Sequence, residues 1–86
     1  MRNEDILTRM TPIFRDVFND PEMIVSLDLT SHDIPDWSSI TMSILVTKIE
    51  REFGIVFKIR EVAMIDGVAS IIHIINAKAD HSGLLK

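Results

Sequence analysis

Residues 36–54 read DWSSITMSILVTKIEREFG and contain the start, the body and the end of one amphipathic helix. The proline that precedes this stretch disfavours helical geometry in the residue before it, so a loop ends here and a helix begins near Ser38. Side-chain oxygens of Asp36, Ser38 and Ser39 can accept hydrogen bonds from the unpaired amides of a first helical turn. Gly54 supplies the left-handed residue that commonly follows a last turn.

The apolar residues of this helix recur at three- and four-residue steps, the spacing of one buried stripe. They are Met42, Leu45, Val46, Ile49 and Phe53. The polar residues fall largely outside the stripe, so we expect one buried and one exposed face. Ser39 stands at the positive end of the helix, where free amides and the helix dipole would stabilise an exposed phosphate ester by about 0.3 to 1 kcal/mol.

Two segments of this stretch resemble the modification site and the second helix of the acyl carrier protein family. They read WSSI at residues 37–40 and IEREFGI at residues 49–55. In that family a W-D-S-L or G-x-D-S-L motif precedes a helix that ends E-x-E-F-G-I, and the motif serine carries 4'-phosphopantetheine. The resemblance implies that Ser39 carries this group here. Ile40 takes the place of the usual leucine, and Ser38 that of the usual aspartate.

The resemblance covers roughly residues 4–78 and implies a carrier rather than an enzyme. A phosphopantetheinyl transferase would move the arm from coenzyme A to Ser39, and the arm would hold an acyl or aminoacyl group as a thioester. The partners would be acyl- or aminoacyl-transferring enzymes of a fatty-acid, polyketide or related biosynthetic pathway. A small domain that keeps its cargo tethered raises the effective concentration of that cargo at each partner.

The second-helix surface, which is acidic in the family, is largely neutral or apolar in this chain. The residues expected to bind partners are Trp37, Ile40, Ser43, Ile44, Thr47 and Glu50. We therefore expect a dedicated partner whose docking surface is less basic and more hydrophobic than that of general fatty-acid enzymes. Methionine fills irregular apolar space, so Met42 and Met64, with Ile44, are candidates to border an acyl-chain site, although each also fits ordinary core packing.

Plainer interpretations stand beside these. Ser39 is also suited to capping a helix without any modification, and Ser38 is a lesser alternative for the attachment site. Trp37 fits packing against the domain as well as it fits partner contact. Because Ser38 replaces the family's aspartate, a carrier-like protein-interaction module that is not phosphopantetheinylated is the alternative function.

Composition limits the remaining classes of function. The chain has 86 residues, a net charge of −4 and no cysteine, which predicts one small domain without disulfides or thiolate chemistry. Without a basic cluster a nucleic-acid partner is disfavoured, and no apolar run is long enough to span a bilayer. We expect a cytoplasmic monomer that does not act on membranes.

Two further kinds of site receive little support. The three histidines, His32, His73 and His81, lack metal-ligand spacing, so no metal site is expected. A hydrolytic triad of Ser39, His32 and either Asp33 or Asp36 is conceivable by composition, but the G-x-S-x-G elbow that such sites use is missing.

The segment before residue 36 predicts one helix and a long connection. Apolar spacing indicates a helix from Glu4 to Phe18, with either a kink at Pro12 or a restart there with Thr11 as cap; we favour the kink. Residues 19–36 form a long connection that we expect to be pinned over the helices. Its spaced apolar residues are Ile24, Leu27, Leu29 and Ile34. A strand over Met23–Leu29 is rejected because no second strand is available to pair with it.

The segment after residue 54 predicts two more helices. A short one spans Arg60–Met64, and a last one is capped by Asp66 and ends near Ala79, although its isoleucine-rich run also fits a strand. Together these elements predict an all-α fold, a small four-helix bundle with three main helices and a short third helix. The resemblance implies that it is of acyl-carrier-protein type. The domain spans residues 1–79, and residues 80–86 form a frayed tail.

Overall fold

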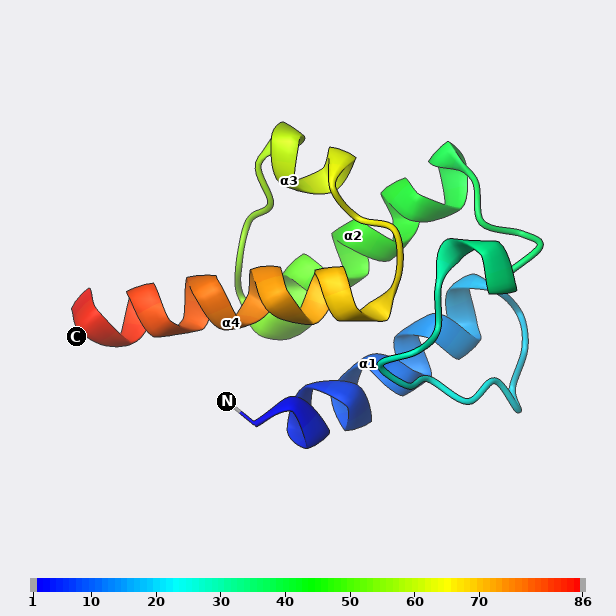
Figure 1. Cartoon of the computed structure of the whole chain (residues 1–86), viewed down its shortest axis with the longest axis horizontal. Coiled ribbons are helices and arrows are strands. Elements are labelled where there is room, and N and C mark those ends of the chain that lie inside the picture. The colour runs from blue at the N-terminus through cyan, green and yellow to red at the C-terminus, as the bar shows by residue number, and fades with distance from the viewer. Residues whose placement is uncertain (1, 86) are drawn as a thin grey trace.

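The computed structural model describes the backbone of residues 2–85 and the side chains of residues 2–78. In this part of the chain four α-helices are arranged around one core (Figure 1). They are α1 (Asn3–Val17), α2 (Ser39–Phe53), α3 (Ile59–Ala63) and α4 (Val68–Leu85). The described residues contain no β-strand, only an isolated bridge between Thr30 and Gly67, so the predicted all-α class is confirmed.

Helix α1 begins and ends one residue earlier than the sequence predicts and buries Ile6, Met10 and Phe14. It is continuous through Pro12, so the alternative in which the helix restarts at that proline is wrong. Proline has no amide hydrogen to donate, yet the turns on both sides stay helical because their apolar side chains share one buried stripe.

Helix α2 follows the sequence pattern closely. Ser38 is its N-cap residue, and Gly54 ends it in the left-handed conformation with φ of 66°. Leu45, Val46 and Ile49 are buried, while Met42 and Phe53 pack half-buried against the core. The predicted apolar stripe is therefore the face that α2 turns inward.

The connection between α1 and α2 is pinned over the helices, but only some of the predicted residues do the pinning. Of those residues, Ile34 is buried and Leu29 packs partly buried against the core. Val25, which was not among them, is also buried, and Arg15 Nε donates to the Met23 carbonyl at 2.9 Å. Ile24 and Leu27, by contrast, are 79% and 45% exposed, so their predicted packing role is wrong. The connection contains one turn of 3-10 helix, η1 (Ser31–Asp33), and the rejection of a strand here is correct.

The short helix α3 lies one residue before its predicted span, and α4 differs from the prediction at both ends. Asp66 is not its cap: the helix begins at Val68, so Gly67 flanks it. The chain there is held against the long connection, because the Ser31 amide donates to the Asp66 carbonyl at 2.8 Å and the Val68 amide donates to the Leu29 carbonyl at 2.9 Å.

At its other end α4 continues past Ala79, where we predicted its end, to Leu85. Residues 80–85 include no proline, and one glycine costs only about 1 kcal/mol in a helix, so nothing in the sequence stops the backbone ladder. The backbone of the predicted tail is thus helical to Leu85, and its last part projects past the other helices (Figure 1). Lys86 and the side chains of residues 79–85 lie outside the described part. The domain boundary after Ala79 stays a prediction.

The isoleucine-rich run belongs to α4 and supplies much of the core, so the strand alternative is wrong. Its buried residues are Val68, Ile71, Ile72, Ile74 and Ile75. They join the buried faces of α1 and α2 in a single cluster. Among the described residues, no helix is both long enough and apolar enough to cross a lipid bilayer.

Candidate functional site at the start of helix α2

Ser38 and Thr41 cap the first turn of α2 reciprocally. The Thr41 amide donates to Ser38 Oγ at 3.2 Å, and the Ser38 amide donates to Thr41 Oγ1 at 2.8 Å. Thr41 Oγ1 in turn donates to the Asp36 carbonyl at 2.8 Å. This is the capping-box arrangement, with threonine in place of the usual glutamate. The Ser38 hydroxyl is therefore engaged in holding the helix start.

Ser39, the next residue, is the first residue of the helix and is exposed. Among the described residues its hydroxyl makes no hydrogen bond. The sequence left Ser38 and Ser39 as alternatives for both capping and modification. The geometry separates them, because Ser38 caps the helix and Ser39 presents an unengaged hydroxyl to solvent.

Two backbone amides at the start of α2, close to this hydroxyl, take no part in the capping and helical hydrogen bonds. The Thr41 amide donates to Ser38 Oγ, and the Met42 amide donates to the Ser38 carbonyl at 2.8 Å. The amides of Ser39 and Ile40 precede the first helical hydrogen bond and lie at the positive end of the dipole. An ester-linked phosphate on Ser39 Oγ would thus meet a favourable environment, which fits a phosphopantetheine arm.

A groove of about 320 Å³ runs beside Ser39 between α2 and α3. Its lining residues are Ser39, Met42, Ser43, Val46, Thr47, Val62 and Ala63. Of the three residues that we considered for an acyl-chain site, Met42 lines this groove, whereas Met64 and Ile44 do not. The groove combines an apolar floor with three hydroxyl groups along α2.

Four of the six predicted partner-binding residues form one exposed face of α2. Ile40 and Ile44 are 74% and 44% exposed, and Ser43 and Thr47 are exposed beside them. Ile44, Ser43 and Thr47 also border a shallow depression that continues to Lys48 and Arg51. The outward face of α2 is therefore apolar near Ser39 and carries the exposed Arg51 toward its other end.

Glu50, a fifth predicted partner-binding residue, has a structural contact. Its Oε2 accepts a hydrogen bond from the Phe57 amide at 2.7 Å and so holds the segment that follows α2. Glu52, the other acid of α2, pairs with Arg9 at 2.9 Å. Both acids of α2 are thus engaged within the domain.

Trp37, the sixth residue, packs against α1. Its ring stacks on Phe18 with centroids 5.8 Å apart and planes 15° apart, and it lies 6.4 Å from the Phe14 ring. The side chain is half-buried. Of its two interpretations, packing against the domain is the one that the structure displays.

The hydrolytic and metal interpretations gain no support. Asp33 Oδ2 accepts hydrogen bonds from the Thr30 amide and hydroxyl at 3.0 and 3.1 Å, so this carboxylate is used to stabilise η1. Within the described residues, no three histidine or acidic side chains come together as metal ligands.

An ion pair that the sequence reasoning missed ties α3 to α4. Glu61 Oε1 lies 2.8 Å from Lys78 Nζ, and it also accepts a hydrogen bond from the Lys58 amide at 2.7 Å. The Lys58 amide first, and Lys78 second, hold the pKa of Glu61 below its ordinary value. A helix start at Lys58 with a glutamate three residues later is a sequence signal for the hydrogen bond between the Lys58 amide and Glu61. No sequence pattern near Glu61 indicates its ion pair with Lys78.

Comparison of the chain with protein-family models, with curated proteins and with solved structures finds no match.

Proposed function

We propose that this chain is an acyl carrier protein that holds an acyl or aminoacyl group on a 4'-phosphopantetheine arm attached to Ser39 Oγ. One observation carries the proposal most directly. Ser39 is exposed, makes no hydrogen bond among the described residues and opens onto a groove, while the neighbouring serine is used as the helix cap. A hydroxyl that is to be esterified has to be accessible to a transferase and must not be needed for a hydrogen bond that stabilises the fold.

The surrounding residues suit this role. The helix start would stabilise the phosphate of the arm through two free amides and the dipole. Met42, Val46 and Val62 offer apolar surface to the cargo, and the hydroxyls of Ser43 and Thr47 lie on the same groove. The arm, once attached, would supply the thiol that bears the cargo as a thioester.

The exposed face of α2 supports a particular kind of partner. Ile40 and Ile44 present apolar surface, Glu50 and Glu52 are occupied within the domain, and Arg51 is exposed at the far end. A partner enzyme with an apolar docking surface would fit this face better than one with a basic surface, because like charges across an interface are penalised.

A carrier-like interaction module without the arm is the second candidate. The observation that favours it is Ser38, which stands where the carrier family has an aspartate and whose hydroxyl is taken up by the capping interaction with Thr41. Such a module would work equally well without the Ser39 hydroxyl.

Intact-mass measurement separates the two candidates. The protein, Ser38→Ala and Ser39→Ala would each be incubated with coenzyme A and a broad-specificity phosphopantetheinyl transferase, after circular dichroism confirms that all three are helical. We expect one phosphopantetheine to be added to the protein and to Ser38→Ala, and none to Ser39→Ala. No addition to the folded protein, together with unmodified protein from its native host, would overturn the carrier proposal in favour of the module.

A further inference from the structure

Helix α3 is attached to the rest of the molecule mainly at its two flanks. It has five residues, none of them buried, and Val62 is its one half-buried apolar side chain among Ile59–Ala63. Before it, Phe57 is buried and its amide is held by Glu50; after it, Ile65 is buried. A short helix between two anchors can move without releasing either of them.

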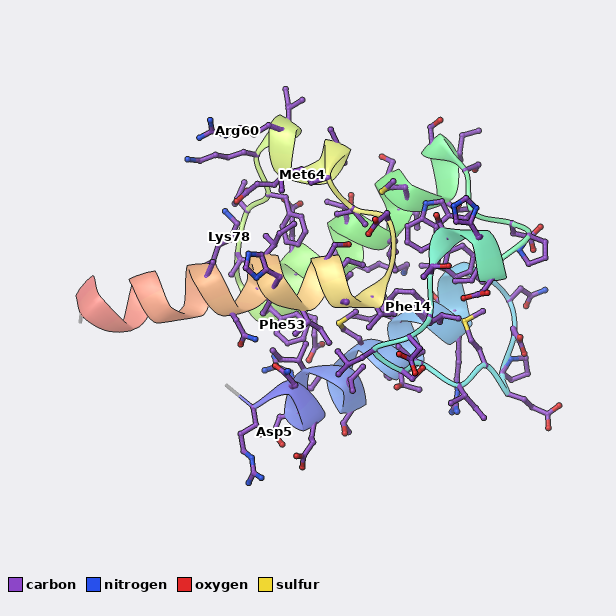
Figure 2. The ribbon with its side chains drawn as sticks, in the orientation of Figure 1. Asp5, Phe14, Phe53, Arg60, Met64 and Lys78 are labelled. Atoms are coloured by element: carbon purple, nitrogen blue, oxygen red, sulfur yellow. The ribbon has the colours of Figure 1, made fainter. Side chains whose placement is uncertain are left out.

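Glu61 makes two short polar contacts from α3. Its Oε1 lies 2.7 Å from the Lys58 amide nitrogen and 2.8 Å from Lys78 Nζ on α4. The two side chains of the ion pair are 24% and 20% exposed, which is far less than the other ion pairs of the described residues. Figure 2 shows the Lys78 side chain rising from α4 on the side of the helix where α3 lies. Reduced exposure to water makes such a pair stronger than a fully solvated one.

The same short helix forms one wall of the groove beside Ser39. Val62 and Ala63 line the groove from α3, and Met42 and Val46 line it from α2. Since Glu61 precedes Val62 directly, any movement of α3 that separates Glu61 from Lys78 also moves this wall.

We propose that the Glu61–Lys78 ion pair is a latch that sets how often the groove beside Ser39 opens. With the pair formed, α3 is held toward α4 and covers Val46. With the pair broken, the anchors at Phe57 and Ile65 keep the fold intact while α3 swings out and exposes the groove. Glu61 and Lys78 are positioning residues, and only the use of the groove for cargo rests on the proposed function.

The absence of cysteine from the chain allows a clean measurement of this opening. A single Val46→Cys substitution places a thiol on the groove at a position that is 8% exposed, and its alkylation by iodoacetamide can be followed by intact mass. Adding Lys78→Met removes the latch but keeps most of the apolar stem. We expect the alkylation rate to rise by about fivefold or more, the factor that a partly buried charge-assisted contact represents.

Matched controls distinguish the latch from a general loss of stability. Lys48→Met breaks another lysine ion pair, to Asp16 at 3.1 Å, which joins α2 to α1 and leaves α3 untouched. A Val68→Cys probe, fully buried in α4 and outside the groove, reports global opening. Glu61→Gln keeps an oxygen for the Lys58 amide but removes the charge. It should therefore accelerate alkylation of the Val46→Cys thiol less than Glu61→Ala, which deletes both contacts.

The proposal requires acceleration at Val46→Cys with Lys78→Met, little change with Lys48→Met and little change at Val68→Cys. Equal acceleration at both thiols, or no acceleration at either, would overturn it. The experiment uses the unmodified protein and needs no phosphopantetheine. The latch proposal can thus be refuted even if Ser39 is modified, and it can be supported even if Ser39 is not modified.

Discussion

Ser38 and Thr41 exchange hydrogen bonds in both directions, amide to hydroxyl, at 3.2 and 2.8 Å. This exchange assigns adjacent serines to different tasks. Ser38 stabilises the start of α2, and Ser39, one residue later, is exposed and makes no hydrogen bond among the described residues. The hydroxyl with a structural partner is not the one proposed to carry the arm.

The cap predicts unequal stability losses at the two serines. Ser38→Ala should lower the free energy of unfolding by about 1 kcal/mol, because the Thr41 amide loses its acceptor. Ser39→Ala should change it by less than about 0.5 kcal/mol, as for most exposed substitutions. Urea unfolding followed by circular dichroism measures both. Similar losses at the two positions would contradict the assignment of the cap.

Gly67 lies where a side chain would meet backbone. A Cβ atom there would come within 2.7 Å of the Leu29 carbonyl oxygen and 2.9 Å of Thr30 Cα, so Gly67→Ala must separate the long connection from the start of α4. We expect a loss of about 1 to 3 kcal/mol in the free energy of unfolding.

Gly54→Ala is the matched control for this prediction. Nothing lies within 4 Å of a Cβ atom at Gly54, and only its left-handed φ of 66° opposes the substitution. The expected loss is about 1 kcal/mol, and Gly54→Asn should recover part of it, because asparagine tolerates this conformation. A Gly67→Ala variant as stable as the parent would show that the two segments do not need to approach so closely.

The lowered pKa of Glu61 predicts one component of the acid sensitivity. A carboxylate whose pKa is lower in the folded than in the unfolded chain contributes stability that is fully present above its ordinary value of 4.5. This contribution is lost as the pH falls through the folded pKa, because the unfolded state then binds the proton first. Urea unfolding between neutral pH and pH values below 4.5 should therefore show a steeper loss for the parent than for Glu61→Gln.

Parallel pH curves for the parent and Glu61→Gln would refute that coupling. Lys78→Met should flatten the curve only in part, since the Lys58 amide, the larger cause of the lowered pKa, remains in place.

The exposed face of α2 predicts a docking effect at Ile44. Under the proposed carrier function, Ile44→Glu should reduce the rate of acyl transfer with the cognate enzyme about tenfold, because a charge would then be desolvated against an apolar partner surface. Ile24→Glu is the control, since Ile24 is also an exposed isoleucine, 79% accessible, but lies in the connection before η1. Steady-state transfer kinetics with holo-protein measure both. Unchanged rates with Ile44→Glu would count against this docking face.

We predict that Trp37 stabilises the fold through packing, independently of any partner. Trp37→Ala should lower the free energy of unfolding by about 2 to 4 kcal/mol, because the stack on Phe18 and the contact with Phe14 are lost together. Trp37→Phe, which keeps an aromatic ring, should cost less than about 1.5 kcal/mol. Thermal unfolding of the parent and of both variants measures these losses of stability. If Trp37→Ala is as stable as the parent, partner contact becomes the better explanation for the residue.

Local patterns predicted most of the helices, because each carries its own signals. The stripe from Met42 to Phe53, the serine cap and Gly54 define α2 within the chain segment itself, and the stripe of α1 passes through Pro12 without a change of phase. The two serines at the candidate site were also visible. The sequence did not show which of them caps the helix, because either serine can do so. Only the hydrogen bonds with Thr41 identify Ser38 as the cap.

Apart from the end of α4, the errors fall where distant segments meet. Asp66 looked like a cap, yet backbone pairing of Leu29 and Ser31 with the start of α4 shifts that start past Gly67. Ile24 and Leu27 looked like anchors, but the path of the connection turns them outward and buries Val25 instead. Hydrophobicity along a loop carries no period that reveals which side chains face the core.

The sequence by itself determined an all-α chain, its helices and the serine pair at the start of α2, because hydrophobic spacing, caps and glycines act within a few residues. Tertiary structure alone decided which residues the groove brings together, the contact of Glu61 with Lys78 and the need for glycine at residue 67. Each of these depends on segments that are far apart in the chain and become neighbours only when the core between them is packed.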